Sequence, residues 1–286
     1  MPVRPHASPN ASIMTRIECR CPSLPRFSAN LGLLWPDRPL LQRIEAAARA
    51  GFRAIEMHWP YDIPASEVAA AAQRHELTVF GINTAPGNQD LREFGLGAAP
   101  GREREFQIQV DQAIAYCAAC KASAIHVMAG CTAASEDRSR ARAVFADNLR
   151  LASTKAAAHG LTLLLEPLNP RDVPGYFYSR LHEAVELIEA LALPNIKLQF
   201  DVYHVGVAEG DVLTKLKRYM PLVGNVQIAA VPSRAEPDEG EIAYPAIFAA
   251  LDESGYSGWV GCEYKPRGDT DEGLKWMRSM ARASRP

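Results

Sequence analysis

The stretch LTLLLEPLNP, residues 161–170, places an almost unbroken apolar run directly before a glutamate and a proline. Short apolar runs of this kind are typical of strands in parallel sheets, which are buried on both faces. An ionised carboxylate without a partner is costly at the end of such a strand. Glu166 is therefore expected to pair with another group, bind a cation or take up a proton.

The same pattern recurs on both sides of this stretch, because short apolar runs alternate with longer amphipathic segments. Such alternation predicts parallel strands joined by helices. The expected strands are residues 26–31, 54–58, 77–83, 124–130, 161–166, 196–201, 223–229 and 259–263. Helices are expected at about 39–51, 66–75, 102–120 and 136–159, with Gly51 ending the first, and a helix-like segment precedes each later strand. Eight such units over roughly 250 residues predict one α/β domain, a single (β/α)8 TIM barrel over residues 25–283.

Composition and charge exclude several kinds of partner. The 286 residues are 48% hydrophobic, which permits a large core, and the formal net charge is −2. Without a basic field, no nucleic-acid partner is expected. No run of about 18 apolar residues is present, so no membrane span is predicted. Residues 1–24 lack a secretory signal and are expected to form a flexible N-terminal extension, in which Met14 is an alternative start.

The cysteines indicate the cellular location. Six cysteines in a chain of this length do not predict a disulfide framework, and they fit a reducing, cytoplasmic location. Cys117 and Cys120 form a CxxC pair within a segment of helical periodicity. Because no second pair stands at metal-binding spacing, both are expected to pack in the core.

Four successive expected strands carry an oxygen-bearing side chain at or near their end: Glu166, Asp201, Gln227 and Glu263. In a TIM barrel these ends meet at one mouth, where neighbouring strands lie about 5 Å apart. Three converging carboxylates repel one another unless a proton or a cation neutralises them. An all-oxygen set suits Mg²⁺ or Mn²⁺ better than Zn²⁺. The alternative is that each side chain only ends a strand and faces water.

Longer motifs add a resemblance that covers almost all of the chain after about residue 25. The chain resembles the hydroxypyruvate isomerase family, within the xylose isomerase-like barrels, in the segments RFSANLGLLWPD (26–37), AGFRAIEMHWPYD (50–62), LLLEPLNPRDVPGYF (163–177), LQFDVYHV (198–205), VQIA (226–229), EPDEGEIAYP (236–245) and GYSGWVGCEYKP (255–266).

This resemblance implies a sugar-acid or ketose isomerase. Glu166 and Glu263 would both hold the metal and move the proton, and Asp201 and Gln227 would complete the ligand set. Glutamine at 227 favours the hydroxypyruvate isomerase branch, since related ketose 3-epimerases usually carry histidine there. A divalent cation would stabilise the enediolate as a Lewis acid, so that hydroxypyruvate and 2-hydroxy-3-oxopropanoate (tartronate semialdehyde) interconvert without a nucleotide cofactor. The glutamate that acts first is left open.

Further polar residues near the expected mouth are candidates for contact with the substrate. By resemblance His204 would hydrogen-bond a substrate oxygen, and Arg234 could clamp a carboxylate. Lys265 is a third candidate, and for each of the three a packed or solvated side chain is the alternative. Glu56 and His58 end the second strand, where substrate contact and support by hydrogen bonding are equally compatible with the sequence.

Two other titratable residues are expected to have structural roles. Glu241 stands in an acidic loop ahead of a helix, where capping is favoured, and His126 is expected to be a satisfied histidine inside the barrel. The chain also departs from the family pattern at Ala230 and Ala235, where polar residues are usual, and in the third-strand loop at 83–90. These departures bear on the substrate and leave the inferred metal set unchanged.

Other activities remain alongside hydroxypyruvate isomerisation. A 2-oxotetronate isomerase needs the same chemistry and a roomier pocket, and a ketose 3-epimerase is a third enzymatic option. A metal-dependent nuclease of the endonuclease IV type would want a histidine-rich multi-zinc cluster and a basic rim. The non-enzyme alternative is a barrel that binds a sugar acid without turnover. Whether the chain forms a homo-oligomer is left open.

Overall fold

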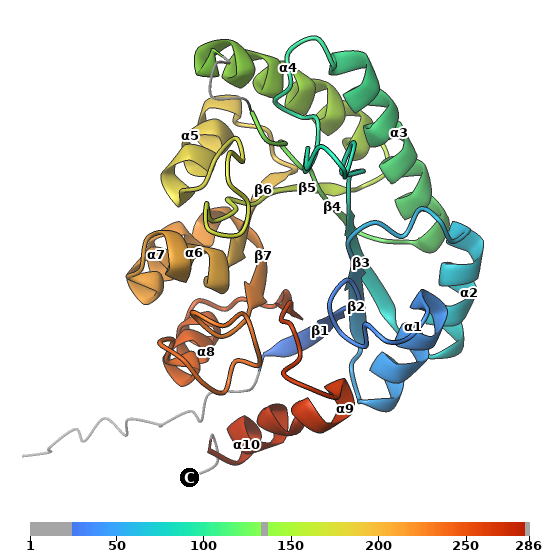
Figure 1. Cartoon of the computed structure of the whole chain (residues 1–286), viewed down its shortest axis with the longest axis vertical. Helices are drawn as coiled ribbons and strands as arrows, with labels where there is room; N and C mark the ends of the chain where they lie inside the picture. The colour runs from blue at the N-terminus through green and yellow to red at the C-terminus, as the bar shows by residue number, and fades with distance from the viewer. Residues whose placement is uncertain (1–24, 133–136, 284–286) are drawn as a thin grey trace, which may run out of the picture.

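The protein, described by a computed structural model over residues 25–132 and 137–283, folds as a closed barrel of parallel strands in sequence order (Figure 1). The predicted TIM barrel is thereby confirmed. The strands are β1 (Arg26–Asn30), β2 (Ala54–Met57), β3 (Thr78–Asn83), β4 (Ala124–His126), β5 (Thr162–Leu165), β6 (Ile196–Asp201), β7 (Val223–Ile228) and β8 (Trp259–Cys262).

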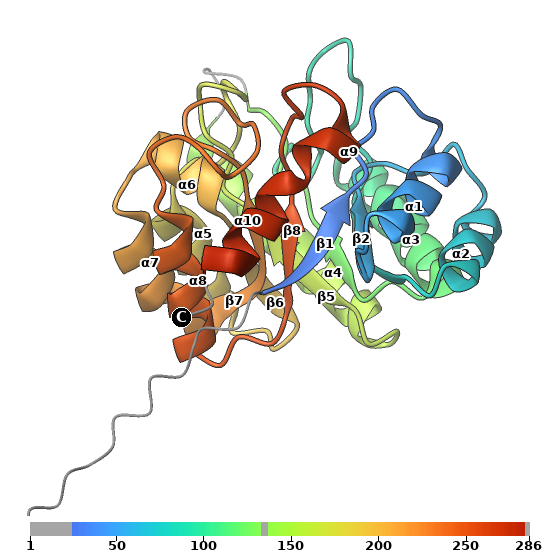
Figure 2. The ribbon, with the colours of Figure 1, turned by 90° about the horizontal axis from the view of Figure 1, so that it is seen from below.

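Helices cover the outside of the barrel, as two perpendicular views show (Figures 1 and 2). They are α1 (Leu40–Arg49), α2 (Ala65–Arg74), α3 (Glu103–Cys120), α4 (Arg138–Ala157), α5 (Leu181–Leu191), α6 (Val202–Ala208), α7 (Val212–Tyr219), the 3-10 helix η1 (Met220–Leu222), α8 (Tyr244–Glu253), α9 (Thr270–Gly273) and α10 (Lys275–Ala283).

Strand β5 shows how the alternation of side chains places the site. Leu163 and Leu165 are fully buried, and Leu164 lines a cavity inside the barrel. Because successive side chains of a strand point to opposite faces, Glu166 follows Leu164 on the inner side. The apolar run therefore ends on a carboxylate because that position opens into the barrel mouth.

Strand β4 is shorter than predicted. It ends at His126, whereas the apolar run continues to residue 130. Beyond the strand, the backbone pairs with the loop after β3, through an isolated bridge between Gly95 and Ala129. Val127 donates to the carbonyl of Leu164 in β5, and Ala98 donates to the carbonyl of Ala129, so residues 127–130 are buried beyond the end of β4.

Two local predictions are confirmed in the helices. Helix α1 ends at Arg49, and Gly51 follows with a φ of +94°, a conformation that suits glycine. Cys117 and Cys120 are buried in α3 as free thiols. The C-terminal helix α10 lies across β1 and β8 (Figure 2), where Trp276 packs edge-on against Phe27.

The N-terminal extension predicted for residues 1–24 lies outside the described residues. Within the described ranges, no helix combines the length and the apolar character needed to cross a membrane.

Candidate functional site

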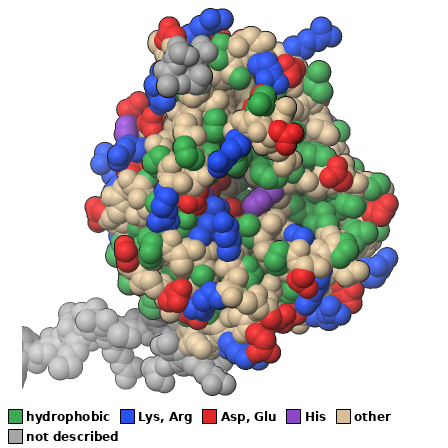
Figure 3. Space-filling model, in the orientation of Figure 1, with side chains coloured by type: hydrophobic (Ala, Val, Ile, Leu, Met, Phe, Trp, Pro, Cys, Tyr) green, Lys and Arg blue, Asp and Glu red, His purple; other side chains and the backbone are tan. Residues whose placement is uncertain are grey.

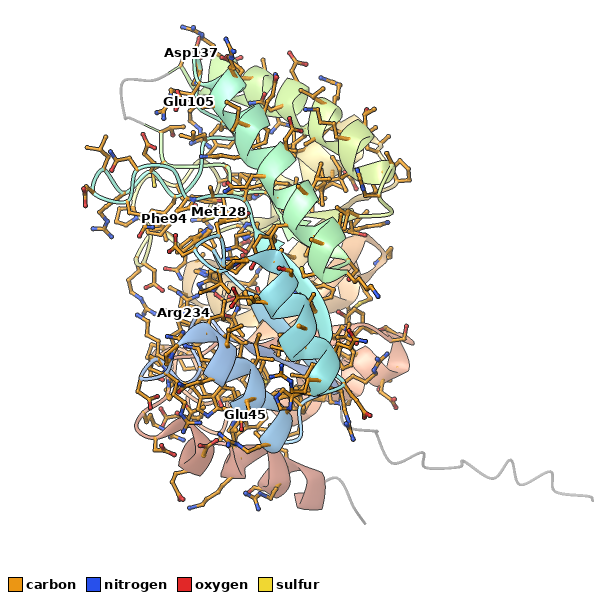
Figure 4. All side chains as sticks on the ribbon, turned by 90° about the vertical axis from the view of Figure 1, so that its right-hand side faces the viewer. Glu45, Phe94, Glu105, Met128, Asp137 and Arg234 are labelled. Atoms are coloured by element: carbon orange, nitrogen blue, oxygen red, sulfur yellow. The ribbon has the colours of Figure 1, made fainter. Side chains whose placement is uncertain are left out.

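The four side chains predicted to converge are all buried at the carboxyl ends of β5 to β8: Glu166, Asp201, Gln227 and Glu263. The sheet register sets Asp201 beside Gln227 across β6 and β7. The space-filling view shows a hollow near the middle of this face, where histidine, arginine and acidic side chains gather (Figure 3). Phe94, Met128 and Arg234 lie on the side of the barrel from which the long loops project (Figure 4).

Glu166 and Asp201 each have one oxygen held by the protein. Gln199 donates from Nε2 to Glu166 Oε2 at 2.7 Å, and the Tyr203 backbone N–H donates to Asp201 Oδ1 at 2.7 Å. The second bond arises because Asp201 is the N-cap of α6. Each carboxylate is thus fixed in orientation, with its other oxygen turned away from these donors.

The other oxygens of these residues define the centre of the site. Glu166 Oε1, Asp201 Oδ2 and Gln227 Oε1 are buried, and none has a hydrogen-bond partner among the described residues. Burial, together with the charges of Glu263 and Asp201, raises the pKa of Glu166 well above its usual value. Burial and the charge of Glu263 raise the pKa of Asp201 to about 7. Three such oxygens form a ligand set that fits a hard divalent cation.

His204 lies next to these acceptors, on α6. Its Nε2 is 3.6 Å from Asp201 Oδ2 and 3.9 Å from Glu166 Oε1, so the three side chains could share an ion. However, the Asn169 backbone N–H donates to His204 Nδ1 at 3.0 Å. Burial lowers the pKa of His204 to about 3, and a neutral ring that accepts at Nδ1 carries its hydrogen on Nε2. We therefore interpret His204 as a hydrogen-bond donor to the site.

Glu263 is held differently, because both of its oxygens accept hydrogen bonds. Arg234 Nη2 donates to Oε1 at 2.9 Å, His58 Nε2 lies 3.3 Å from Oε1, and Asn30 Nδ2 donates to Oε2 at 3.1 Å. Burial alone would raise the pKa of Glu263, but the hydrogen bond from His58 and the Arg234 guanidinium outweigh it and lower the pKa to about 2. Glu263 is thus the anionic member of the site.

Arg234 reaches Glu263 from a tight turn after β7. Its φ is +58°, its backbone N–H donates to Ala230, and Ala230 donates to the carbonyl of Ala235. Both alanines are buried. Arg234 Nη1 also donates to Asp172 Oδ2 at 3.3 Å. The alanines that depart from the family pattern therefore lie inside the turn that presents the guanidinium.

Three other residues singled out from the sequence differ in their exposure to solvent. Lys265 is exposed, and its backbone N–H donates to the Arg234 carbonyl at 2.7 Å. Glu56 is buried in β2, and burial together with the charge of Glu263 raises its pKa to about 8. Glu241 is exposed in the loop before α8.

His126 differs from the satisfied histidine that was predicted. Its Nδ1 is 3.3 Å from Glu166 Oε2, but its Nε2 is buried and meets no hydrogen-bonding group within the described part of the chain. Burial lowers its pKa to about 4. The sequence offered no signal for this position, because His126 lies inside the strand predicted over residues 124–130, whereas β4 ends at His126 in the structure.

Sequence reasoning missed the side chains that orient the predicted residues, among them Asn30, Gln199 and Asn169. Asn30 is the last residue of β1, and the sequence signal was a polar residue one position before the end of the strand predicted over 26–31. Gln199 lies two residues before Asp201 and so faces the same side of β6. Asn169 stands in the loop after β5, where nothing local indicates its partner.

Burial of Asp201, together with its repulsion by Glu263, makes a testable contribution to stability. The pKa of Asp201 is raised to about 7 on folding, so its destabilising effect grows as the pH rises from about 4 to 7. Asp201→Asn should therefore raise the melting temperature of metal-free protein at pH 8, by the equivalent of a few kcal/mol. The advantage should shrink as the pH falls toward 4. Equal melting temperatures at pH 8 in chelator-treated samples would contradict this account.

The closed barrel and the buried acceptors at its mouth define the class: a TIM-barrel protein with one candidate cation site among the described residues. The sequence agrees, since residues 44–280 match the xylose isomerase-like TIM barrel family. The chain belongs to this family.

Several relatives carry names that describe a reaction. The 2-oxo-tetronate isomerase of Cupriavidus necator is 45% identical over 89% of this chain and 98% of its own length. The hydroxypyruvate isomerase of Escherichia coli is 37% identical over 88% of this chain and 98% of its own. A crystal structure described as an AP endonuclease, family 2, from Brucella melitensis is 42% identical, with a TM-score of 0.87 over 90% of this chain and 99% of that chain. The predicted membership among isomerases of the hydroxypyruvate isomerase type is confirmed at this level.

Proposed function

We propose that this chain is a divalent-metal-dependent isomerase that interconverts the aldehyde and ketone forms of a short hydroxy-oxo acid. The observation that carries the proposal is the set of three buried oxygens without partners among the described residues, on Glu166, Asp201 and Gln227. They come from the ends of three neighbouring strands. The pKa of Glu166 is raised and that of Glu263 is lowered, so the two glutamates at the site differ in pKa. Such an arrangement is suited to proton transfer between adjacent carbons.

The donor set supports Mg²⁺ or Mn²⁺ as the bound ion. Glu166, Asp201 and Gln227 would hold it, and Glu263 is the predicted fourth ligand. Glu263 Oε2 accepts one hydrogen bond, from Asn30, and a carboxylate oxygen has capacity for more. When bound, the ion supplies Lewis-acid stabilisation of the negative charge that develops next to the carbonyl.

The other steps, proton transfer and substrate binding, are assigned to side chains of the protein. Glu166 and Glu263 are the groups proposed to remove and return the proton. His204 would donate from Nε2 to a substrate oxygen. Arg234 would attract the substrate carboxylate, and Lys265 adds positive charge at the exposed rim. The substrate is a small molecule, and its isomerisation requires no nucleotide cofactor. We propose that the protein acts in the cytoplasm.

Two substrates are compatible with this chemistry. Hydroxypyruvate was the substrate predicted from the sequence, and the Escherichia coli relative supports it. Identity favours 2-oxotetronate by a small margin, since the Cupriavidus necator relative is 45% identical, a putative hydroxypyruvate isomerase of Homo sapiens 42% and the Escherichia coli relative 37%. We therefore expect 2-oxotetronate to be turned over faster than hydroxypyruvate. A multi-zinc nuclease is disfavoured, because the described residues hold one group of metal-binding type, Glu166, Asp201 and His204.

Removal of the metal tests this function directly. Chelator-treated protein should lose at least about 100-fold in rate, since Lewis-acid stabilisation is worth several kcal/mol. Added Mg²⁺ or Mn²⁺ should restore it. The assay follows deuterium entry at carbon in D₂O with 2-oxotetronate, hydroxypyruvate and common ketoses.

Three outcomes separate the alternatives. Exchange with a ketose and inversion at its third carbon would indicate an epimerase. Ligand binding without exchange in the metal-loaded protein would indicate a binding barrel. Full activity after complete removal of metal would contradict the proposed function.

A further inference from the structure

Glu56 occupies an unusual position for a residue expected near a substrate. It lies in β2, and the residue is 5% exposed. Its Oε1 accepts from Gln227 Nε2 at 3.1 Å and from Asn30 Nδ2 at 3.2 Å. The carboxylate is thus engaged with protein groups below the mouth.

Asn30 connects this carboxylate to a second one. The same Nδ2 that contacts Glu56 donates to Glu263 Oε2 at 3.1 Å. The orientation of the amide is set by its other end, because Asn30 Oδ1 accepts from the Gly32 backbone N–H at 2.9 Å. A continuous hydrogen-bonded path therefore runs from Gln227 through Glu56 and Asn30 to Glu263.

Gly261, in β8, leaves space for this hydrogen-bonded path because it has no side chain. A Cβ added to Gly261 in β8 would lie 2.2 Å from Glu56 Oε1 and 2.8 Å from Gln227 Cγ. Atoms do not approach so closely, so a side chain at 261 would displace the pair. Gly261 has ordinary extended backbone in β8, and it is the close approach of Glu56 and Gln227 that favours glycine there.

An amide side chain has two unlike ends, and its oxygen alone ligates a hard cation. By accepting from Nε2, Glu56 holds the donor end of Gln227 inside the barrel, which leaves Oε1 as the end without a partner in the described structure. We propose that Glu56 is a positioning residue, which orients Gln227 as an oxygen ligand and, through Asn30, aligns Glu263. This inference rests on the proposed metal-dependent function.

To position Gln227, the side chain at 56 needs sufficient length and an acceptor oxygen. It does not need a negative charge. Two variants separate these properties. Glu56→Gln keeps the length of the side chain and an acceptor oxygen, and it removes the charge. Glu56→Asp keeps the charge but is one methylene shorter, so its carboxylate falls short of Gln227.

The experiment measures Mn²⁺ affinity from the electron paramagnetic resonance signal of free Mn²⁺, with the full chain. Glu56→Asp should bind Mn²⁺ about 10–100-fold more weakly than the unchanged protein, as is usual when a residue that orients a ligand is lost. Glu56→Gln should stay within about threefold, well inside that range. Asn195→Leu is the matched control, because it removes an amide at the opposite end of the barrel, where Asn195 bonds Ser153 and Leu161.

The outcomes distinguish this inference from the function on which it rests. Normal affinity in Glu56→Asp with weak binding in Glu56→Gln would show that charge matters and would overturn the positioning role. Equal affinity in all variants would overturn it as well. If the unchanged protein bound no Mn²⁺, the proposed function would fail together with this inference. Circular dichroism melting curves identify any variant that has lost its fold.

Discussion

Glu166→Gln is expected to lower isomerisation and carbon-bound hydrogen exchange by about 10²–10⁴-fold, the usual contribution of a general acid or base. The variant replaces the carboxylate whose Oε1 faces the site without a partner in the described structure. It removes at once the proposed proton carrier and a proposed ligand of the ion.

The same substitution should leave the fold intact. The pKa of Glu166 is raised by burial and by the charges of Glu263 and Asp201, so a neutral amide relieves a cost of the folded state. The melting temperature of metal-free Glu166→Gln should equal or exceed that of the unchanged protein at pH 8. Deuterium exchange in D₂O and circular dichroism measure the two quantities. Glu241→Gln, in an exposed loop, is the matched control and should retain full activity. Unchanged exchange in Glu166→Gln would remove Glu166 from the mechanism.

Glu263→Gln should lose activity to a similar extent, about 10²–10⁴-fold, but its effect on stability should have the opposite sign. Glu263 is the partner of Arg234, at 2.9 Å, and both side chains are largely buried. Removing one member of a buried ion pair leaves the other uncompensated, at a cost of about 3 kcal/mol.

Chemical denaturation at pH 7 measures this difference. Glu263→Gln should unfold at lower denaturant concentration than the unchanged protein, although Asp172 still pairs with Arg234 and limits the loss. Glu263→Gln with additional Arg234→Met should recover part of the stability and none of the activity. The account of Glu263 as the anion of the site would be wrong if Glu263→Gln were as stable as Glu166→Gln.

The fold could be predicted because its signal is local. Buried parallel strands appear as short apolar runs, and the intervening helices as amphipathic segments, so each unit is visible in its own stretch of chain. Strand β4 is the exception, since its apolar run continues over residues 127–130, where Ala129 pairs with Gly95 in the loop after β3. An apolar run reports burial, and it does not report whether the burying partner is a strand or a loop.

The positions of the site residues could be predicted for the same reason. A polar residue after an apolar run marks the carboxyl end of a strand, and in a barrel those ends share one mouth. Glu166, Asp201, Gln227 and Glu263 were found in this way, and the structure buries all four there. Their roles as ligands and proton carriers stay predictions, to be tested by the variants above.

The sequence by itself determined that this chain closes an eight-unit barrel with oxygen-bearing side chains at the ends of its later strands. Only the tertiary structure decided which atom of each side chain is held and which is left facing the centre. Gln227 donates to Glu56, 171 residues earlier, and Glu263 accepts from Asn30, 233 residues earlier. These pairings arise when β1 meets β8 and the barrel closes. Periodicity along the chain reports the direction in which a side chain points, and it carries no information about the residue that a distant strand brings to meet it.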